Sequence, residues 1–213
     1  MSIEISLIPV TDFQQNCRVL YNSESREAVV FDPGGDSNKI INFLKAKQLD
    51  LKGIYLTHSH IDHCGGVAGL LRFKEVDLYG HENEKIFREN VTMAATMYGL
   101  NVQDFENCPE PTCLLCGGEN IKILGQQVKV LATPGHSPGS LSYWFYEKNW
   151  LFSGDVLFRG SIGRTDLPAG NSGHLMQSIQ DLVRDLPPLT HIYSGHGPDT
   201  TLEQEAESNP FLI

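Results

Sequence analysis

The stretch THSHIDHCGG, residues 57–66, decides how the rest of this chain is interpreted. Between residues 58 and 63 it places His58, His60, Asp62 and His63. Imidazole and carboxylate groups are costly to bury without a partner, so a hydrophobic core would not select such a cluster. Side chains alternate between the two faces of an extended chain, and we therefore expect His58 and His60 to point the same way. The stretch predicts a metal site.

The same residue types recur at the ends of three other apolar strands. His136 lies in TPGHSPGS (133–140), Asp155 in FSGDVLF (152–158) and His196 in YSGHGP (193–198). Five imidazoles and two carboxylates in all suit two divalent ions bridged by Asp155. Nitrogen and oxygen ligands without thiolate fit zinc, and equally iron or manganese, and we expect two divalent ions with zinc as the leading choice. Such coordination lowers the pKa of a bound water from about 15.7 to about 7, which provides a nucleophile at neutral pH.

Strand and helix patterns alternate along the chain, which predicts an α/β fold with helices covering the sheets. Apolar strand patterns cover residues 3–10, 17–21 and 28–32, and an amphipathic helix pattern begins at a capping Asp36. We expect a single long helix over residues 82–99 and a polar loop over 103–120. Because the histidine motifs lie on both sides of that loop, we expect residues 1–213 to form a single domain.

Composition restricts the possible partners. The 213 residues carry a formal net charge of −10, which argues against a nucleic-acid groove and against an anionic membrane surface. No apolar run approaches the ~18 residues of a membrane-spanning helix, and no basic segment precedes an apolar run at the N-terminus. Five cysteines, an odd number, suggest reduced thiols. We therefore expect a cytoplasmic protein acting on a small molecule, with its oligomeric state left open.

The four motifs, in this order, resemble the ordered motifs of the metallo-β-lactamase superfamily. The resemblance implies a four-layer αβ/βα sandwich of two mixed sheets flanked by helices, with the metals at one edge. It assigns Asp62 and Asp155 a catalytic as well as a metal-binding role. One implied ligand set is His58, His60 and His136, the other is Asp62, His63 and His196, and Asp155 bridges them.

Further residues place the chain near the short-form glyoxalase II-like hydrolases of that superfamily. GSIGRTDLP (160–168) and NPFL (209–212) carry this resemblance. Zinc β-lactamases of the commonest type have a cysteine at a metal position, where this chain has Asp155. Flavodiiron relatives have a glutamate in place of His60. Long-form glyoxalase II adds a basic C-terminal extension, whereas the present sequence ends at Ile213.

The implied activity is hydrolysis of a thioester, with a glutathione conjugate as the leading substrate (hydroxyacylglutathione hydrolase). The alternative is a glutathione persulfide dioxygenase with a mononuclear iron site. Because a glutathione thioester is anionic and this chain is acidic, Arg164 is the candidate substrate-binding residue. The physiological thiol and acyl group stay open.

The other candidate residues each allow more than one role. Asp32 could orient a ligand histidine or form a turn. Cys64 adjoins the ligand cluster, but a small buried residue is the expected role. Cys108, Cys113 and Cys116 supply at most three thiols to a structural zinc, which needs four ligands, and their role is left open.

Overall fold

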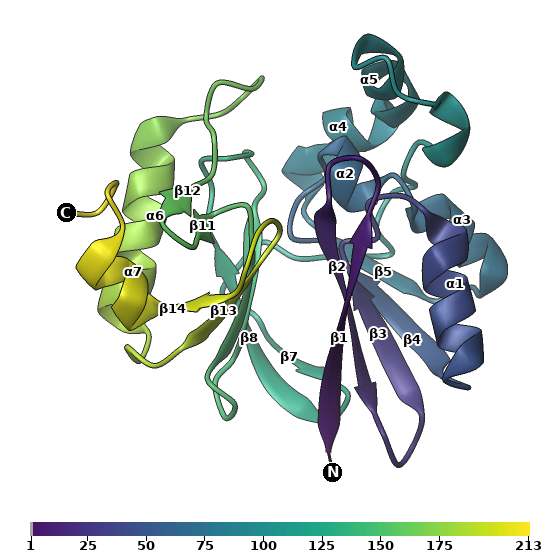
Figure 1. Ribbon diagram of the computed structural model, residues 1–213, viewed down its shortest axis with the longest axis horizontal. Coiled ribbons are helices and arrows are strands. Elements are labelled where there is room, and N and C mark those ends of the chain that lie inside the picture. Colours follow the sequence, from purple (N-terminus) through teal and green to yellow (C-terminus); the bar gives the residue numbers. More distant parts are fainter. Residues whose placement is uncertain (1) are drawn as a thin grey trace. The chain divides into compact units, whose positions relative to one another are not determined.

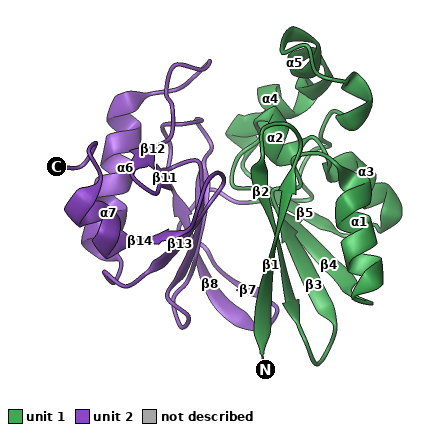
Figure 2. Ribbon diagram, viewed as in Figure 1, with its two compact units in different colours: residues 1–114 green, residues 115–213 purple. Residues whose placement is uncertain are grey.

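The computed structural model describes residues 2–213, and the chain divides between Leu114 and Leu115 into two compact units (Figure 2). Each unit contains one six-stranded mixed sheet with helices packed against it (Figure 1). The expectation that residues 1–213 act as one domain stays a prediction.

The sheet of the first unit combines an antiparallel and a parallel half. Its first three strands form an antiparallel meander, and the following strands pair in parallel. Parallel neighbours need a crossover connection, and helical segments occupy those connections. The strand order follows the sequence: β1 (Ile3–Val10), β2 (Gln15–Asn22), β3 (Glu27–Phe31), β4 (Asp50–Tyr55), β5 (Asp77–Gly80) and β6 (Cys113–Leu114).

Helices α1 and α3 cover one face of this sheet. Ile40 and Leu44 of α1 and Leu70 of α3 are fully buried in one core with Val30 and Ile54 from the sheet. This is the buried stripe that the amphipathic pattern predicted. The helical segments of the unit are α1 (Ser37–Ala46), α2 (Ile61–Cys64), α3 (Val67–Phe73), η1 (Glu82–Glu84), α4 (Lys85–Glu89), α5 (Val91–Met97) and η2 (Val102–Asp104).

Two local expectations in this unit are wrong. The single helix expected over 82–99 breaks at Asn90, whose φ of −118° and ψ of 20° lie outside the helical region. Its side-chain amide donates to the carbonyl of Ile86, and such side-chain bonds compete with helix continuation. Asp36 precedes α1 without capping it, because its carboxylate accepts instead from the amide of Thr11.

The second unit repeats the layering with a different strand order. Leu175 and Ile179 of α6 pack in one core with Leu151 and Ile192 from the sheet. The sheet order is β14 (Thr200–Thr201), β13 (His191–Ser194), β10 (Trp150–Gly154), β9 (Leu141–Phe145), β8 (Gln126–Ala132) and β7 (Asn120–Ile123), and the unit also contains the helices α6 (Ser172–Asp185) and α7 (Leu202–Ser208).

The chain bends at the candidate metal-site residue Asp155. Strand β10 ends at Gly154, which adopts a φ of +53°. The chain then forms a separate hairpin of β11 (Leu157–Phe158) and β12 (Ser161–Ile162). Asp155 therefore lies in the bend between a buried strand and a hairpin.

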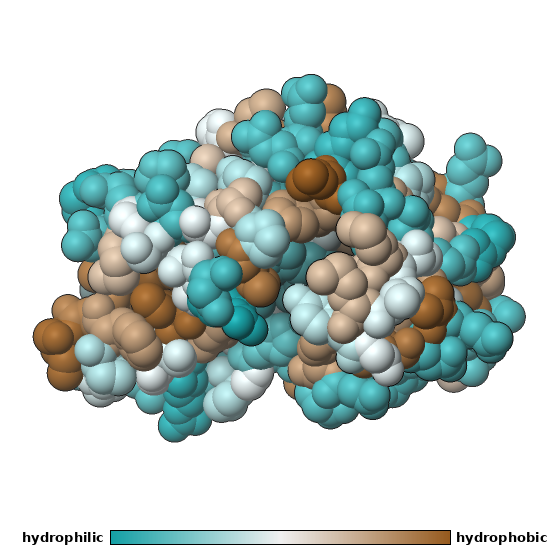
Figure 3. Space-filling model, turned by 90° about the horizontal axis from the view of Figure 1, so that it is seen from above, coloured by the Kyte–Doolittle hydropathy of each residue, from teal (hydrophilic) through white to brown (hydrophobic). Residues whose placement is uncertain are grey.

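Across residues 2–213, no helix is long and apolar enough to cross a membrane. The face drawn in Figure 3 is mostly hydrophilic, with hydrophobic residues in small separate groups.

Candidate metal centre

In the first unit, four potential ligands follow directly after β4. His58 and His60 lie in the loop, and Asp62 and His63 lie in the first turn of α2. A ligand atom of His58 lies within 4.8 Å of one of His60 and of one of His63. The Nε2 atom of His63 is 4.0 Å from Oδ2 of Asp62. His58 and His63 are buried, so these are not surface histidines that meet by chance.

Asp32 fixes which ring nitrogen carries the proton in two of these histidines. Its buried carboxylate accepts from the Thr57 amide (2.7 Å), the Thr57 hydroxyl (2.7 Å) and Nδ1 of His63 (3.0 Å). Because the Thr57 hydroxyl gives its proton to Asp32, it can only accept from Nδ1 of His58, 3.1 Å away. Both rings thus keep their lone pair on Nε2, the nitrogen then left for a metal. Asp32 was expected either to orient a ligand histidine or to form a turn, and these contacts favour the role of orienting the candidate ligand histidines.

Backbone packing holds the same loop. A Cβ atom at Gly34 would lie 1.4 Å from the carbonyl oxygen of Asp62, so only glycine allows the DPGG turn to lie against α2. The fully buried carboxylate of Glu84 accepts from the amide of Ser59, at 2.9 Å, between the first two histidines. The rings of Phe87 and His60 pack nearly at right angles, with their centroids 4.9 Å apart. Sequence reasoning missed Glu84 and Phe87, because both lie within a stretch that resembles an ordinary exposed helix.

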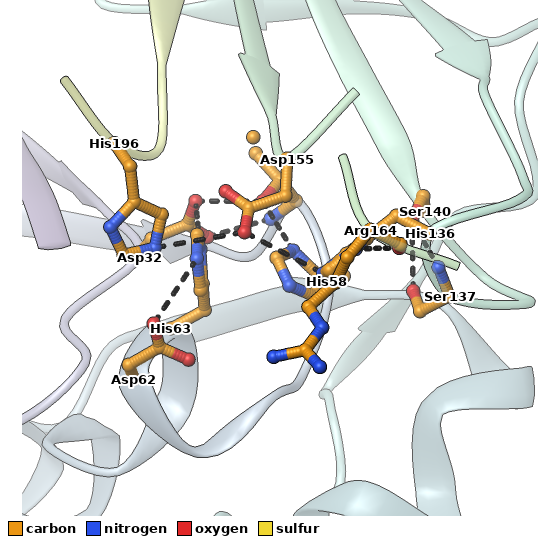
Figure 4. Close-up of polar contacts among 12 residues, drawn as sticks. Asp32, His58, Asp62, His63, His136, Ser137, Ser140, Asp155, Arg164 and His196 are labelled. Atoms are coloured by element: carbon orange, nitrogen blue, oxygen red, sulfur yellow. Dashed lines mark hydrogen bonds and ion pairs between the residues drawn. The ribbon is translucent and has the colours of Figure 1, made fainter. Parts of the chain in front are cut away.

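In the second unit, one carboxylate oxygen lies between two imidazole nitrogens. Oδ2 of Asp155 is 3.5 Å from Nε2 of His136 and 3.6 Å from Nε2 of His196 (Figure 4). Two ligands held about 2.1 Å from a tetrahedral metal are roughly 3.4 Å apart. Each separation therefore fits two ligands of a shared metal ion, and the donor set of nitrogen and carboxylate oxygen fits zinc, iron or manganese.

The loop after the β11–β12 hairpin packs against two of these candidate ligands, His136 and Asp155. The carbonyl oxygen of Arg164 is 2.8 Å from Nδ1 of His136. A carbonyl can only accept, so Nδ1 donates and Nε2 again keeps the lone pair. A Cβ atom at Gly163 would lie 2.0 Å from the carbonyl oxygen of Asp155 and 3.2 Å from Cβ of His136. Only glycine therefore allows the loop to lie this close to both residues.

The side chain of the candidate substrate-binding residue forms an exposed ion pair. The guanidinium of Arg164 donates to both carboxylate oxygens of Asp166, at 2.7 and 2.6 Å. These hydrogen bonds from Arg164 lower the pKa of Asp166 to about 2. At neutral pH the carboxylate is ionised, and Arg164 already holds the type of group that a substrate would offer.

The thiol next to the ligand cluster is structural. Cys64 is fully buried and its sulfur donates to the carbonyl of Ser59, at 3.3 Å. Burial raises the pKa of the Cys64 thiol well above its usual range, and contact with Cys108 adds to the effect. The expected role as a small buried residue is confirmed.

Comparison with known proteins decides the family. The family model described as the metallo-β-lactamase superfamily matches residues 10–196. The chain belongs to this superfamily. The match confirms the fold class expected from the motifs, an α/β metallo-β-lactamase fold with two mixed sheets flanked by helices.

Three members of the superfamily are similar over nearly their whole length. Hydroxyacylglutathione hydrolase GloC of Haemophilus influenzae is 39% identical over 99% of this chain and 98% of its own. The B3 metallo-β-lactamase BLEG-1 has a TM-score of 0.90 and 40% identity, covering 98% of this chain and 99% of the other. TTHA1623, solved in a di-iron-bound form, has a TM-score of 0.87 and 36% identity, covering 97% of this chain and 100% of the other.

These relatives place the chain among metal-dependent hydrolases. Its histidine and aspartate groups suit divalent metal ions, and the similar proteins include one with two irons. Whether the groups of the two units act as one binuclear site remains a prediction.

Proposed function

We propose that this protein hydrolyses a thioester, with a glutathione conjugate as the leading substrate, in a binuclear metal site. In this proposal one ion is bound by His58, His60 and His136, the other by Asp62, His63 and His196, and Asp155 bridges them. The observation that carries the proposal is the position of Oδ2 of Asp155, 3.5 and 3.6 Å from the Nε2 atoms of two histidines.

The roles of the residues follow from their contacts. Asp32 and the carbonyl of Arg164 keep His63 and His136 in the tautomer that presents Nε2. We assign Asp62 and Asp155 as catalytic carboxylates, since they would both ligate and set the position of the attacking water. When bound, divalent ions lower the pKa of that water to about 7 and polarise the carbonyl that it attacks.

The choice of a thioester follows from similarity and from leaving-group chemistry. GloC, at 39% identity, is named as a hydroxyacylglutathione hydrolase. An ordinary thiol has a pKa of about 8.5, so its thiolate departs near neutral pH without a strong general acid. A site built from carboxylate and imidazole ligands then suffices for the reaction.

We further propose that Arg164 binds a carboxylate of the substrate. The chain has a formal charge of −10, so an anionic substrate needs local positive charge. The planar guanidinium forms two parallel bonds to Asp166, and a substrate carboxylate would use the same geometry. Binding then exchanges Asp166 for the substrate.

The experiment that tests this proposal combines metal analysis with assays of thioester cleavage, of oxygen uptake with glutathione persulfide and of β-lactam hydrolysis. Protein reloaded separately with zinc, iron or manganese is expected to bind close to two ions per chain and to cleave a glutathione thioester. Asp155→Ala should lower occupancy of both sites and His60→Ala that of one. His174→Ala, a change at an exposed histidine of α6, is the matched control and should alter neither.

Other outcomes would select other functions. Oxygen uptake with glutathione persulfide, at one iron per chain, would show a persulfide dioxygenase activity in place of hydrolysis. The protein must be tested with iron as well as zinc, because TTHA1623 was solved in a di-iron-bound form. Hydrolysis of a β-lactam but not of a thioester would place the activity with that of BLEG-1. Thioester cleavage that persists after complete chelation would remove the metal mechanism.

A further inference from the structure

The hairpin β11–β12 connects two of the candidate metal-site groups within the second unit. Asp155 lies two residues before the hairpin, and Arg164, whose carbonyl accepts from His136, lies two residues after it. The amide of Gly163 donates to the carbonyl of Val156, at 3.2 Å, which ties the two ends together. Any displacement of this short hairpin would therefore move both ends.

Two buried residues near the C-terminus hold the tip of that hairpin. The side-chain amide of Asn209 donates to the carbonyls of Ser161 (3.0 Å) and Phe158 (3.4 Å). The carboxylate of Glu205 accepts from the amide of Gly160 at 2.7 Å and from Asn209 at 2.8 Å. Three backbone groups of one tight turn are thus bound by two side chains.

Both side chains are placed for this task by the rest of the unit. Glu205 and Asn209 are 1% and 0% exposed, and Glu205 also accepts from the hydroxyl of Thr200. Asn209 follows α7 directly, and its own carbonyl oxygen Oδ1 accepts from the amide of Phe211. Buried polar groups keep their positions because leaving one without its partner is unfavourable.

We infer that Glu205 and Asn209 are positioning residues for the metal centre: by clamping the hairpin tip they fix the carbonyl of Arg164 and so hold His136 with its proton on Nδ1. The inference rests on the proposed metal-binding role of His136. It gives the NPFL motif, which the proposed reaction leaves unused, a function in the site. Without the clamp, the proton of His136 is expected to move to Nε2, toward Asp155, which is the form that cannot bind a metal through Nε2.

The test reads the tautomer of His136 directly. Nitrogen–proton NMR of the metal-free protein at about pH 9, where imidazoles are neutral, distinguishes Nδ1–H from Nε2–H. The wild type is expected in the Nδ1–H form. In Asn209→Ala the ratio of Nδ1–H to Nε2–H should fall about 3- to 10-fold, the equivalent of one ordinary hydrogen bond.

Matched variants separate positioning from general stability. Glu205→Ala should act like Asn209→Ala, whereas Glu205→Gln keeps an acceptor for Gly160 and should retain most of the Nδ1–H form. Ser208→Ala, which removes a hydrogen bond on the exposed side of α7, is the control and should leave the ratio unchanged. Should Asn209→Ala not fold, the Glu205→Gln and Glu205→Ala pair provides the same comparison.

Metal affinity gives a second reading, independent of any substrate. Asn209→Ala should lower the affinity for the ion that His136 binds by about 10-fold. This is the lower end of the loss seen when a hydrogen-bond partner of a metal ligand is removed. A lower melting temperature with an unchanged tautomer and unchanged metal affinity would overturn the inference and make the clamp merely structural. If the wild type cleaves no thioester, the proposed function fails, but the tautomer ratio still decides on the clamp.

Discussion

Asn in place of Asp32 is the most informative single change in this protein. The carboxylate accepts from three donors: the amide and the hydroxyl of Thr57 and Nδ1 of His63. Asparagine replaces one of the two carboxylate oxygens by an NH₂ group, which can only donate. This NH₂ group must then face a group that donates to Asp32 in the wild type. Which side gives way determines what the variant loses.

The backbone decides the orientation. The amide of Thr57 can only donate, whereas the Thr57 hydroxyl can accept instead and His63 can move its proton to Nε2. Asp32→Asn is therefore expected to keep its oxygen toward the Thr57 amide and to turn its NH₂ toward His63. In that arrangement Nδ1 of His63 becomes the acceptor and Nε2 loses its lone pair for a metal. The hydroxyl of Thr57 then donates to His58, which undergoes the same change.

The expected result is a selective loss of metal binding. Removal of a group that orients a metal-ligating histidine lowers affinity about 10- to 100-fold, or about 1.4 to 2.8 kcal/mol. Stability of the metal-free protein should change by less than about 1 kcal/mol, because the hydrogen bonds that join residue 32, Thr57, His58 and His63 are all kept, some with donor and acceptor exchanged. Chelator competition measures the first quantity and thermal unfolding of the metal-free protein the second.

Asp36→Asn is the matched control. Asp36 has nearly the same left-handed backbone, with φ of 47° against 49° for Asp32, and also accepts from a backbone amide, that of Thr11. It contacts no histidine through the bonds described, so the same loss of charge should leave metal affinity unaltered. The reasoning is refuted if Asp32→Asn binds metal within twofold of the wild type, or if its loss is in metal-free stability instead.

Three further changes have defined outcomes. Arg164→Ala should lower kcat/KM for a glutathione thioester about 5- to 70-fold, from about 1.5–3 kcal/mol for a charged hydrogen bond less about 0.5 for the surface pair it replaces. A small uncharged thioester should show little change, and Arg184→Ala, in an equally exposed ion pair, should show none on either. Gly163→Ala should destabilise the protein by about 1–3 kcal/mol through overpacking against the carbonyl of Asp155, seen as a lower melting temperature. Alkylation at about pH 8 should modify exposed Cys116 long before Cys64, whose pKa is raised by burial; mass spectrometry that finds both labelled together would contradict this.

The parts of the fold that depend on hydrophobic pattern could be predicted from the sequence. The buried stripe of α1, with Ile40 and Leu44, and the early apolar strands follow directly from periodicity. The broken helix at Asn90 could not be, because each half has an ordinary helical pattern and the break depends on one side-chain bond to Ile86. Asp36 has the right residue type for a cap, but a tertiary contact with Thr11 takes its carboxylate.

The candidate site divides in the same way. Donor atoms could be predicted because chemistry restricts metal ligands to a few residue types and the motifs place them at strand ends. Asp32 was a candidate partner from the sequence, but the other partners could not be predicted, since they are a glutamate in an apparently exposed helical stretch, a backbone carbonyl and a threonine hydroxyl. Glu84, buried against the amide of Ser59, has no signature in spacing or composition. Contacts of this kind exist only once the chain has folded.

The three histidines whose proton positions follow from their contacts reach the same state by different means. His63 donates to a carboxylate, His58 to a hydroxyl and His136 to a backbone carbonyl. Each partner lies on the Nδ1 side, so each ring has its Nε2 lone pair available. A cluster of histidines selected only for charge or packing would not need one tautomer in every ring, whereas a metal centre does, because a protonated nitrogen cannot be a ligand. The shared tautomer, fixed by partners from separate parts of the chain, is therefore stronger support for metal binding than the number of histidines.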